Sequence, residues 1–178
     1  MSRVFINAES IRSHLGTPNV NQEALAEYIE LIQEREDISS IQIYSRFEGD
    51  SIDKLSYLSG ARWLSAFCRA PLIKYSCRVG KYGINNPGMR RGFNSTHAID
   101  IVISNRIKFS PQQDILLITG NYDLWPVYQD LAHENTSKMF HMLSPISESY
   151  SEFIPSEEEI EDIHNLKVHD IEEVIERR

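Results

Sequence analysis

Four polar or acidic residues stand where apolar stretches of the sequence end or begin, and their side chains could do chemistry together. Asn7 follows the first strand-like stretch, and Asn121 and Asp123 follow the most apolar run of the chain. Asp100 lies near the start of a helix-like stretch. Carboxylate oxygens are preferred ligands of hard divalent cations, and an amide carbonyl can ligate such an ion without adding charge. If the fold brings these residues together, the chemistry that they support is the binding of a metal ion.

The asparagine and aspartate after the apolar run belong to a segment that predicts strand, tight turn and helix. Residues 115–118 form a continuous apolar run, which is typical of a strand covered on both faces. The polar turn 119–123 follows, and Pro126 fits the first turn of a helix over residues 124–131, where a missing N–H costs little. Ligands of open parallel sheets bind at the carboxyl ends of the strands. The turn is therefore a candidate site, although Asp123 is also a favourable N-cap for the helix.

The rest of the chain alternates between strand-like and helix-like stretches, and these must position the four residues. Strands that alternate with helices imply parallel βαβ units. We therefore predict an α/β fold of three layers, with a mostly parallel sheet of about five strands and helices on both faces. Strands are expected at residues 3–7, 41–44, 71–79, 115–118 and 138–143, a turn at residues 7–10, and helices at residues 22–34, 53–67, 96–107, 124–131, 147–154 and 156–164.

The length of the chain and its acidic C-terminus suggest how it is divided. The 178 residues are enough for one domain with its own core. Residues 157–161 contain four glutamates, and a charged tail is expected from Val168 to Arg178. We therefore predict a domain over residues 1–154 and an acidic, helical C-terminal extension over residues 155–178.

Charge and cysteine content bear on the class of protein and its compartment. The net charge of −8 argues against a broad basic surface for duplex nucleic acid, but not against a local basic patch. The two cysteines, Cys68 and Cys77, fit free thiols in a reducing compartment. The sequence has no apolar run long enough to span a membrane, and it begins without the features of a signal peptide. A cytoplasmic protein that does not bind a membrane is therefore expected.

Three short segments carry the candidate residues in order along the chain: residues 6–10 (Ile-Asn-Ala-Glu-Ser), 98–100 (Ala-Ile-Asp) and 119–124 (Thr-Gly-Asn-Tyr-Asp-Leu). In order, spacing and character they resemble the NYN family, the PIN-like ribonuclease domains related to the LabA group. That family shows an Ile-Asp-x-x-Asn turn after its first strand, a Gly-Val-Asp helix start and a Ser-Gly-Asp-x-Asp-Phe turn. The resemblance covers residues 3–154 and implies a PIN-like, Rossmann-like version of the three-layer fold.

The resemblance also implies a reaction and a set of site residues. The family cleaves RNA phosphodiesters with Mg²⁺ or Mn²⁺, which stabilises the attacking and leaving oxygens of an in-line displacement. On this basis the catalytic positions are Asp100, Asp123, Asn7 and Asn121, the metal ligands are Asp100, Asp123 and Glu9, and the candidate substrate contacts are Ser10, Thr119, Arg90 and Arg91.

The chain departs from the family at positions that matter for metal binding. Asn7 and Asn121 stand where the family has aspartates, and Ser10 stands where it has an asparagine. The two aspartates that remain can neutralise one divalent ion but not two. The sequence therefore predicts a weakened metal site, to which Glu9 would contribute if its side chain turned inward.

Each of these residues also has a purely structural interpretation. Asp100 could stabilise a helix N-terminus. Asn7 and Asn121 could be turn residues, which asparagine favours without any ligand. Arg90 and Arg91 lie in a long glycine-rich loop that could either clamp an RNA phosphate or be solvated.

Two functions from different classes follow from these alternatives. The first is an RNA-processing endoribonuclease with a weakly held Mg²⁺ or Mn²⁺ ion. The second is a catalytically inactive, NYN-derived protein that binds RNA, a nucleotide or a protein partner. A small-molecule enzyme of the flavodoxin type has less support, because no glycine-rich phosphate loop follows the first strand. RNA, a protein partner and a second copy of the chain all stay open as binding partners.

Overall fold

The computed structural model describes residues 2–15, 19–34, 37–45, 59–76, 95–109, 113–121, 125–135, 137–145, 165–171 and 175–176. The helices are α1 (Ala8–Leu15), α2 (Gln22–Ile32), α4 (Ser59–Cys68), α6 (Ser95–Phe109) and α7 (Trp125–Glu134). The strands are β1 (Ser2–Asn7), β2 (Asn19–Val20), β3 (Ile38–Ser45), β4 (Leu72–Ser76), β5 (Asp114–Thr119), β6 (Phe140–Ser144), β7 (Leu166–Asp170) and β8 (Ile175–Glu176).

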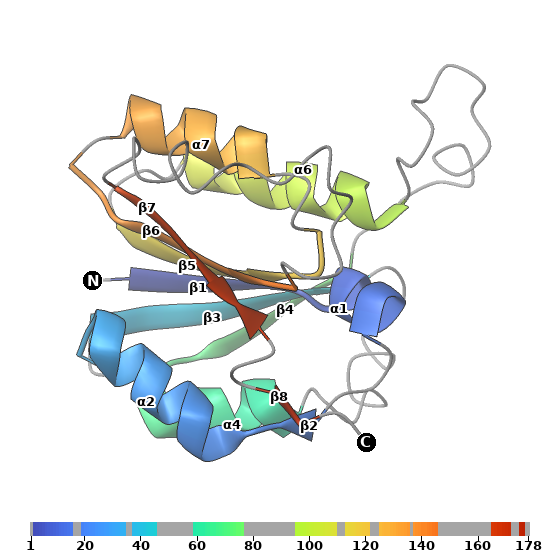
Figure 1. Ribbon diagram of the computed structural model, residues 1–178, viewed down its shortest axis with the longest axis vertical. Coiled ribbons are helices and arrows are strands. Elements are labelled where there is room, and N and C mark those ends of the chain that lie inside the picture. The colour runs from blue at the N-terminus through green and yellow to red at the C-terminus, as the bar shows by residue number, and fades with distance from the viewer. Residues whose placement is uncertain are drawn as a thin grey trace.

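Six of these strands form one sheet in which every neighbouring pair is parallel. Their order across the sheet is β4-β3-β1-β5-β6-β7. Helices α6 and α7 cover one face of the sheet, and α2 and α4 cover the other (Figure 1). This arrangement confirms the predicted three-layer α/β fold, with six strands in place of about five. The short strands β2 and β8 pair antiparallel in a separate sheet.

The strand order brings β1 and β5 together at the centre of the sheet, although they lie far apart in the sequence (Figure 1). The chain first moves outward from β1 through β3 to β4. It then returns through α6 to β5 and moves outward on the other side, through β6 to β7. Doubly wound folds bind ligands at such a reversal, outside the carboxyl ends of the strands. The residues there are Asn7 and Thr119, which are register partners at the ends of β1 and β5.

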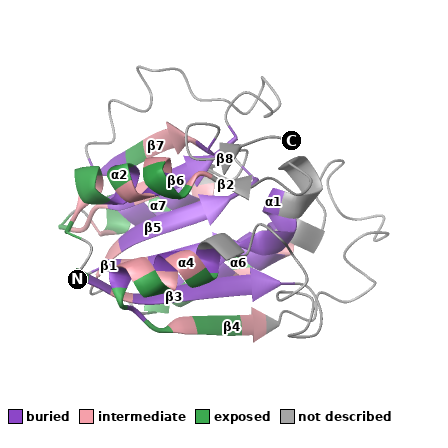
Figure 2. Cartoon of the chain, turned by 90° about the horizontal axis from the view of Figure 1, so that it is seen from below, coloured by how far each residue is buried: buried purple, intermediate pink, exposed green. Residues whose placement is uncertain are grey.

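The strand β5 is central and buried, as the apolar run at residues 115–118 predicts. It pairs with β1 on one side and with β6 on the other, and none of these four residues is more than 7% exposed. Figure 2 shows β5 and β3 in the colour of buried residues, whereas the edge strand β4 is largely intermediate or exposed. The prediction of a central, fully buried strand is therefore confirmed.

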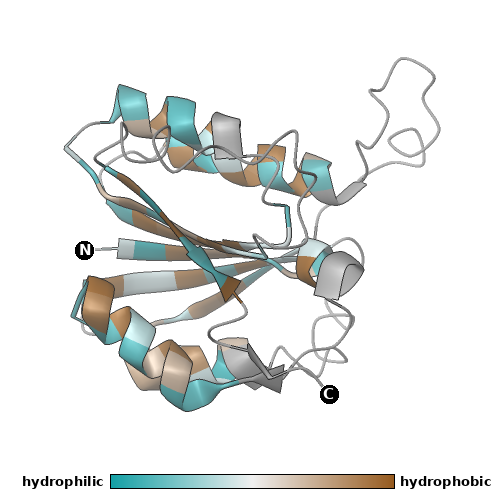
Figure 3. Cartoon of the chain, viewed as in Figure 1, coloured by the Kyte–Doolittle hydropathy of each residue, from teal (hydrophilic) through white to brown (hydrophobic). Residues whose placement is uncertain are grey.

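Alternating residues of the strands fill two hydrophobic cores on opposite faces of the sheet. On β1, Val4 and Ile6 pack in the core that α2 and α4 cover, and Phe5 packs in the core that α6 and α7 cover. Figure 3 shows that α2, α6 and α7 each carry hydrophobic as well as hydrophilic residues, as expected for helices that bury one side. Burial of Ile99 and Ile103 in the second core fixes α6, and with it the position of Asp100.

The start of α2 agrees with its sequence signal. Asn21 is the N-cap, and its side-chain oxygen accepts a hydrogen bond of 3.1 Å from the backbone nitrogen of Ala24. The helix buries Leu25, Tyr28 and Ile29, whose spacing places them on one face.

A helix begins at Ala8, where the sequence predicted only a turn over residues 7–10. The reason is a cap: the side-chain oxygen of Asn7 accepts a hydrogen bond of 3.1 Å from the backbone nitrogen of Ser10. An asparagine that bonds the third residue of a helix in this way acts as its N-cap. The prediction of a turn was wrong because Asn7 favours turns and helix starts alike.

The strand β7 lies within the segment that the sequence assigned to an acidic helical extension and a charged tail. Leu166–Asp170 pair in parallel with β6 and form one edge of the main sheet. At these residues the expected helix and tail are wrong. An edge strand tolerates charged residues, and here Leu166 is buried while Lys167 is exposed, so the short segment lacks a strong apolar pattern.

Several predictions fall outside the described residues. They concern the last residues of the strand expected at 71–79, Cys77, and the helices expected at 147–154 and 156–164. Cys68 is described and is a buried free thiol. Within the described ranges, no helix has the length and apolar character needed to cross a membrane.

Candidate functional site

The carboxylate of Asp100 is the centre of a buried hydrogen-bond network at the carboxyl ends of β1 and β5. Asp100 lies on α6 and is 1% exposed. Its Oδ2 accepts hydrogen bonds from the Thr119 hydroxyl, at 3.0 Å, and from the Asn121 side-chain nitrogen, at 2.8 Å. Its Oδ1 accepts a hydrogen bond of 3.0 Å from the Tyr128 hydroxyl on α7. The Asn7 side chain is a fourth hydrogen-bond partner of this carboxylate.

A second group of hydrogen bonds ties the start of α1 to the turn after β5. The Ser10 hydroxyl donates to the backbone oxygen of Asn7 at 2.8 Å and accepts from the backbone nitrogen of Gly120 at 2.8 Å. It also lies 3.1 Å from the Thr119 hydroxyl, which in turn accepts from the backbone nitrogen of Asn121 at 3.1 Å. These bonds link the carboxyl ends of both β1 and β5 to the start of α1.

Burial disfavours the ionised form of Asp100, and the hydrogen bonds of the network stabilise that form. Burial raises the pKa of Asp100 to about 6, and hydrogen bonds from Asn121, Thr119, Asn7 and Tyr128 limit the rise. Burial, followed by the nearby charge of Asp100, raises the pKa of Tyr128 well above its ordinary value. At neutral pH the site therefore holds an ionised carboxylate surrounded by neutral donors.

The structure brings together most of the residues that the sequence singled out. Those that meet at the ends of β1 and β5 are Asn7, Ser10, Asp100, Thr119 and Asn121. Glu9 follows Asn7 in the first turn of α1 and is buried, with 5% of its surface exposed. Asp123, Arg90 and Arg91 lie outside the described residues.

The side chains in this network are closed to solvent. Asn7, Ser10, Thr119 and Asn121 are each 0% exposed. The hydrogen bonds given above join Ser10 and Thr119 to protein atoms, so their predicted role as substrate contacts stays a prediction.

The sequence interpretation missed Tyr128 as part of the site. Its hydroxyl donates a hydrogen bond to Oδ1 of the Asp100 carboxylate. The signal was present, because Tyr128 shares the buried face of α7 with Leu131 and Ala132. A tyrosine on a buried helix face needs a hydrogen-bond partner for its hydroxyl, and the acid on the neighbouring helix supplies it.

The donor set does not fit a Mg²⁺ or Mn²⁺ ion at the described residues. A hard cation needs several oxygen ligands, at least some of them anionic. Here both oxygens of Asp100 accept bonds from hydroxyl or amide donors, and Asn121 turns its nitrogen toward the carboxylate. Across the part of the chain that the structure describes, no group of three or more His, Cys, Asp or Glu side chains could hold a metal ion.

Fold and site together define a three-layer α/β protein with a buried polar network at the point where its strand order reverses. No protein-family model matches the chain, and no curated protein matches it. Among solved structures, the chain is similar to a protein of unknown function from Vibrio parahaemolyticus RIMD 2210633. The two share 12% sequence identity with a TM-score of 0.51, over 98% of this chain and 94% of the other. At this identity the similarity supports the fold alone.

Proposed function

We propose that this chain is an NYN-like, PIN-like domain that binds RNA and does not cleave it by the metal-dependent reaction of that family. The observation that carries the proposal is the state of Asp100, whose two oxygens accept hydrogen bonds from Thr119, Asn121 and Tyr128. An acid used in this way is an internal acceptor. A metal ion at the same place would have to displace these donors.

Two features support the NYN-like part of the proposal. The three segments that carry the resemblance meet at one edge of the sheet, where β1 and β5 end. The strand order reverses at the same point, which is where open α/β sheets bind their ligands. RNA is the ligand that the resemblance implies. The proposal also includes binding of a protein partner or of a second copy of the chain. It places the protein in the cytoplasm.

We expect no metal-dependent cleavage of RNA, because the site has too little negative charge to hold the metal ion. Two of the positions that would hold the metal are amides, Asn7 and Asn121, and both are buried within hydrogen-bond reach of Asp100. Neutral amides provide none of the negative charge that a divalent ion needs. Their side chains serve instead as hydrogen-bond partners of the Asp100 carboxylate.

The proposal is tested by measuring binding and cleavage of a labelled single-stranded RNA by the same preparation. We expect binding in the presence of a chelator, and no faster loss of full-length RNA when Mn²⁺ is added in excess. The isosteric variant Asp100→Asn serves as the control, since it removes the acid and keeps the side-chain shape. Rapid, chelator-sensitive cleavage that disappears in this variant would overturn the proposal.

A slow endoribonuclease is the second candidate, and the burial of Glu9 favours it. This glutamate lies two residues after Asn7 in the first turn of α1, with only 5% of its surface exposed. If the side chain of Glu9 reached Asp100 and the predicted ligand Asp123, the three carboxylates would supply enough negative charge for one Mg²⁺ or Mn²⁺ ion. If a slow metal-dependent cleavage is found, Glu9→Gln should reduce it. An unchanged rate in Glu9→Gln would exclude Glu9 from that role.

A further inference from the structure

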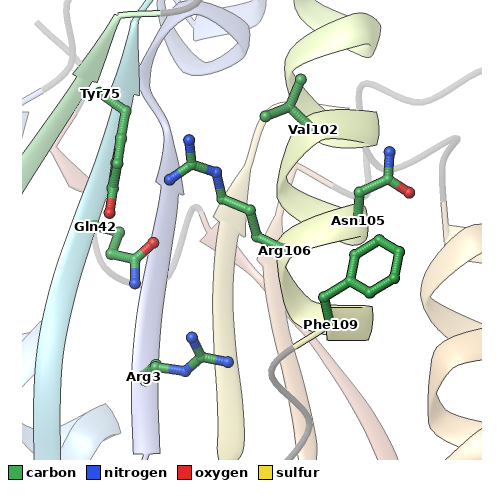
Figure 4. A pocket seen from close by; sticks show the side chains of 7 residues that line it. All are labelled: Arg3, Gln42, Tyr75, Val102, Asn105, Arg106 and Phe109. Atoms are coloured by element: carbon green, nitrogen blue, oxygen red, sulfur yellow. The ribbon is translucent and has the colours of Figure 1, made fainter.

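A separate cavity lies between three strands and the C-terminal half of α6 (Figure 4). Its volume is about 420 Å³, which falls in the range of roughly 300–1,000 Å³ typical of small-molecule sites. Arg3 of β1, Gln42 of β3 and Tyr75 of β4 line it from the sheet, and Arg106 and Phe109 line it from the helix. None of these residues belongs to the hydrogen-bond network around Asp100.

Two arginines give this cavity a positive character on a chain whose net charge is −8. The guanidinium carbon of Arg106 lies 3.9 Å from the centre of the Tyr75 ring and 5.4 Å from that of Tyr44. That of Arg3 lies 5.1 Å from the centre of the Phe5 ring. Contacts of this kind hold a guanidinium by its flat face. An anion binds a guanidinium at its edge, which carries the N–H donors.

The setting of Arg3 favours an anionic ligand. Burial lowers the pKa of the Arg3 guanidinium, because its charge loses hydration. An anion in the cavity would offset this loss, and a phosphate offers oxygens that match the guanidinium fork. Local charge therefore complements a phosphate, although the whole chain is acidic.

Neutral donors and an exposed ring complete the lining. The side-chain oxygen of Gln42 accepts a hydrogen bond of 2.7 Å from the Tyr44 hydroxyl, which turns the amide so that its nitrogen is the remaining donor. Phe109, the last residue of α6, is 84% exposed. Figure 4 shows its ring beside Asn105 at the edge of the cavity. A ring so exposed has a face on which a planar base can stack.

We propose that this cavity binds a nucleotide unit, with its phosphate on Arg3 and Arg106 and its base on Phe109. The geometry indicates an anionic, planar ligand, and the choice of a nucleotide rests on the proposed RNA-binding function. A free mononucleotide and one unit of a single-stranded RNA share this chemistry, so the experiment must separate the two sources.

The experiment measures the affinity of a short labelled oligoadenylate and of AMP, each without metal and at several salt concentrations. The test variants are Phe109→Ala and Arg106→Gln. The matched controls are Leu31→Ala, an equally exposed apolar residue on α2, and Lys108→Gln, an exposed cation on α6 outside the cavity lining. Thermal melting of every variant checks that the fold is kept.

The two test variants should lose affinity in different ways. Phe109→Ala should weaken oligoadenylate binding by roughly 5- to 100-fold, as expected for the loss of one base–aromatic stack, without changing its salt dependence. Arg106→Gln should also weaken binding. It should lower the slope of log affinity against log salt by about 0.7, the contribution of one phosphate contact on a single strand. Arg106→Lys should keep that slope, and both control variants should bind like the original chain.

The outcomes separate this inference from the proposed function. If the RNA binds but both test variants bind it as tightly as the original chain, the cavity is not its site, and the proposed function stands. If AMP binds in the same variant-dependent way and RNA does not, the nucleotide cavity stands and RNA binding is overturned. If neither probe binds, both proposals are overturned.

Discussion

Asp100 places a negative charge inside the protein, at a cost that the surrounding donors only partly offset. Its carboxylate has four neutral hydrogen-bond partners, yet burial still raises its pKa to about 6. An asparagine at this position would fill the same space without a charge. Acids with perturbed pKa values are concentrated at functional sites, so Asp100 marks this network as a candidate site at some expense of stability.

Asp100→Asn should therefore gain stability relative to the original chain as the pH rises. The pKa of Asp100 is higher in the folded state, at about 6, than its ordinary value of 3.8, so the folded state binds this proton more tightly. The stability that it contributes is present at low pH and is lost as the pH rises through 6. The free energy of unfolding of the variant, relative to the original chain, should rise by about 2 kcal/mol between about pH 4.5 and 7.5.

Denaturant unfolding of both proteins over this pH range provides the measurement. Other titrating groups are common to both chains and cancel in the difference. A difference that stays constant with pH would mean that Asp100 titrates in the folded protein as it does in the unfolded one.

Tyr128 should contribute to the stability of the protein mainly through its hydrogen bond to the charged form of Asp100. Tyr128→Phe removes the donor to Oδ1, and an underpaired buried charge costs about 1–3 kcal/mol or more. The variant should be destabilised more at pH 8 than at pH 5, where the acid is largely protonated. Denaturant unfolding of Tyr128→Phe, Asp100→Asn and the double variant tests this. If the two changes are additive, the hydroxyl and the carboxylate do not interact.

At the scale of elements, the side chain of Ser10 links α1 to the turn after β5. The Ser10 hydroxyl joins the cap of α1 to the backbone nitrogen of Gly120. Because this amide lies in the turn after β5, the position of Asn121 in the site depends on where α1 docks.

Ser10→Ala should therefore loosen the turn after β5. The variant leaves the buried Gly120 nitrogen without its acceptor, at a cost of about 1–3 kcal/mol. Native-state hydrogen exchange should show faster exchange of the Gly120 amide. Ser65→Ala removes a comparable hydroxyl, which donates to Ala70 at the end of α4, and should leave this amide protected. Unchanged protection of Gly120 in Ser10→Ala would show that α1 does not fix the turn.

The elements that could be predicted are those whose apolar pattern matches their burial. The run at residues 115–118 reads as a buried strand because both of its faces are covered. The strand β7 could not be predicted in the same way. It is an edge strand in which Lys167 and Asp170 carry charge. Its place in the sheet depends on pairing with β6, and such pairing leaves no local pattern in the sequence.

At the scale of the whole molecule, topology creates the site. Asn7 and Thr119 are more than a hundred residues apart, and they become neighbours because the chain reverses direction across the sheet between β4 and β5. The alternation of strands and helices made this meeting predictable. The orientation of the side chains was not predictable, since it depends on which donors surround Asp100 once the cores have packed.

The double change Asn7→Asp, Asn121→Asp should turn this network into a metal site. Each aspartate has almost the volume of the asparagine it replaces, and an aspartate at position 7 can still cap α1. Both changes replace a donor to Asp100 by another carboxylate, and the Asn121 nitrogen is now only 2.8 Å from Oδ2. In chelator the carboxylates repel one another, so the variant should melt below the original chain. Mn²⁺ that binds only the folded state should reverse this.

A hundredfold excess of Mn²⁺ over Kd stabilises a folded protein by about 2.7 kcal/mol, which corresponds to a rise in melting temperature of roughly 5–10 °C for a chain of this size. The original chain should respond weakly, because it offers the ion too little negative charge. Asn105→Asp is the matched control, since it adds one charge at an exposed position on the same helix as Asp100. If the double variant melts at the same temperature with and without Mn²⁺, Asn7 and Asn121 do not occupy former ligand positions, and the NYN-like assignment of this site is wrong.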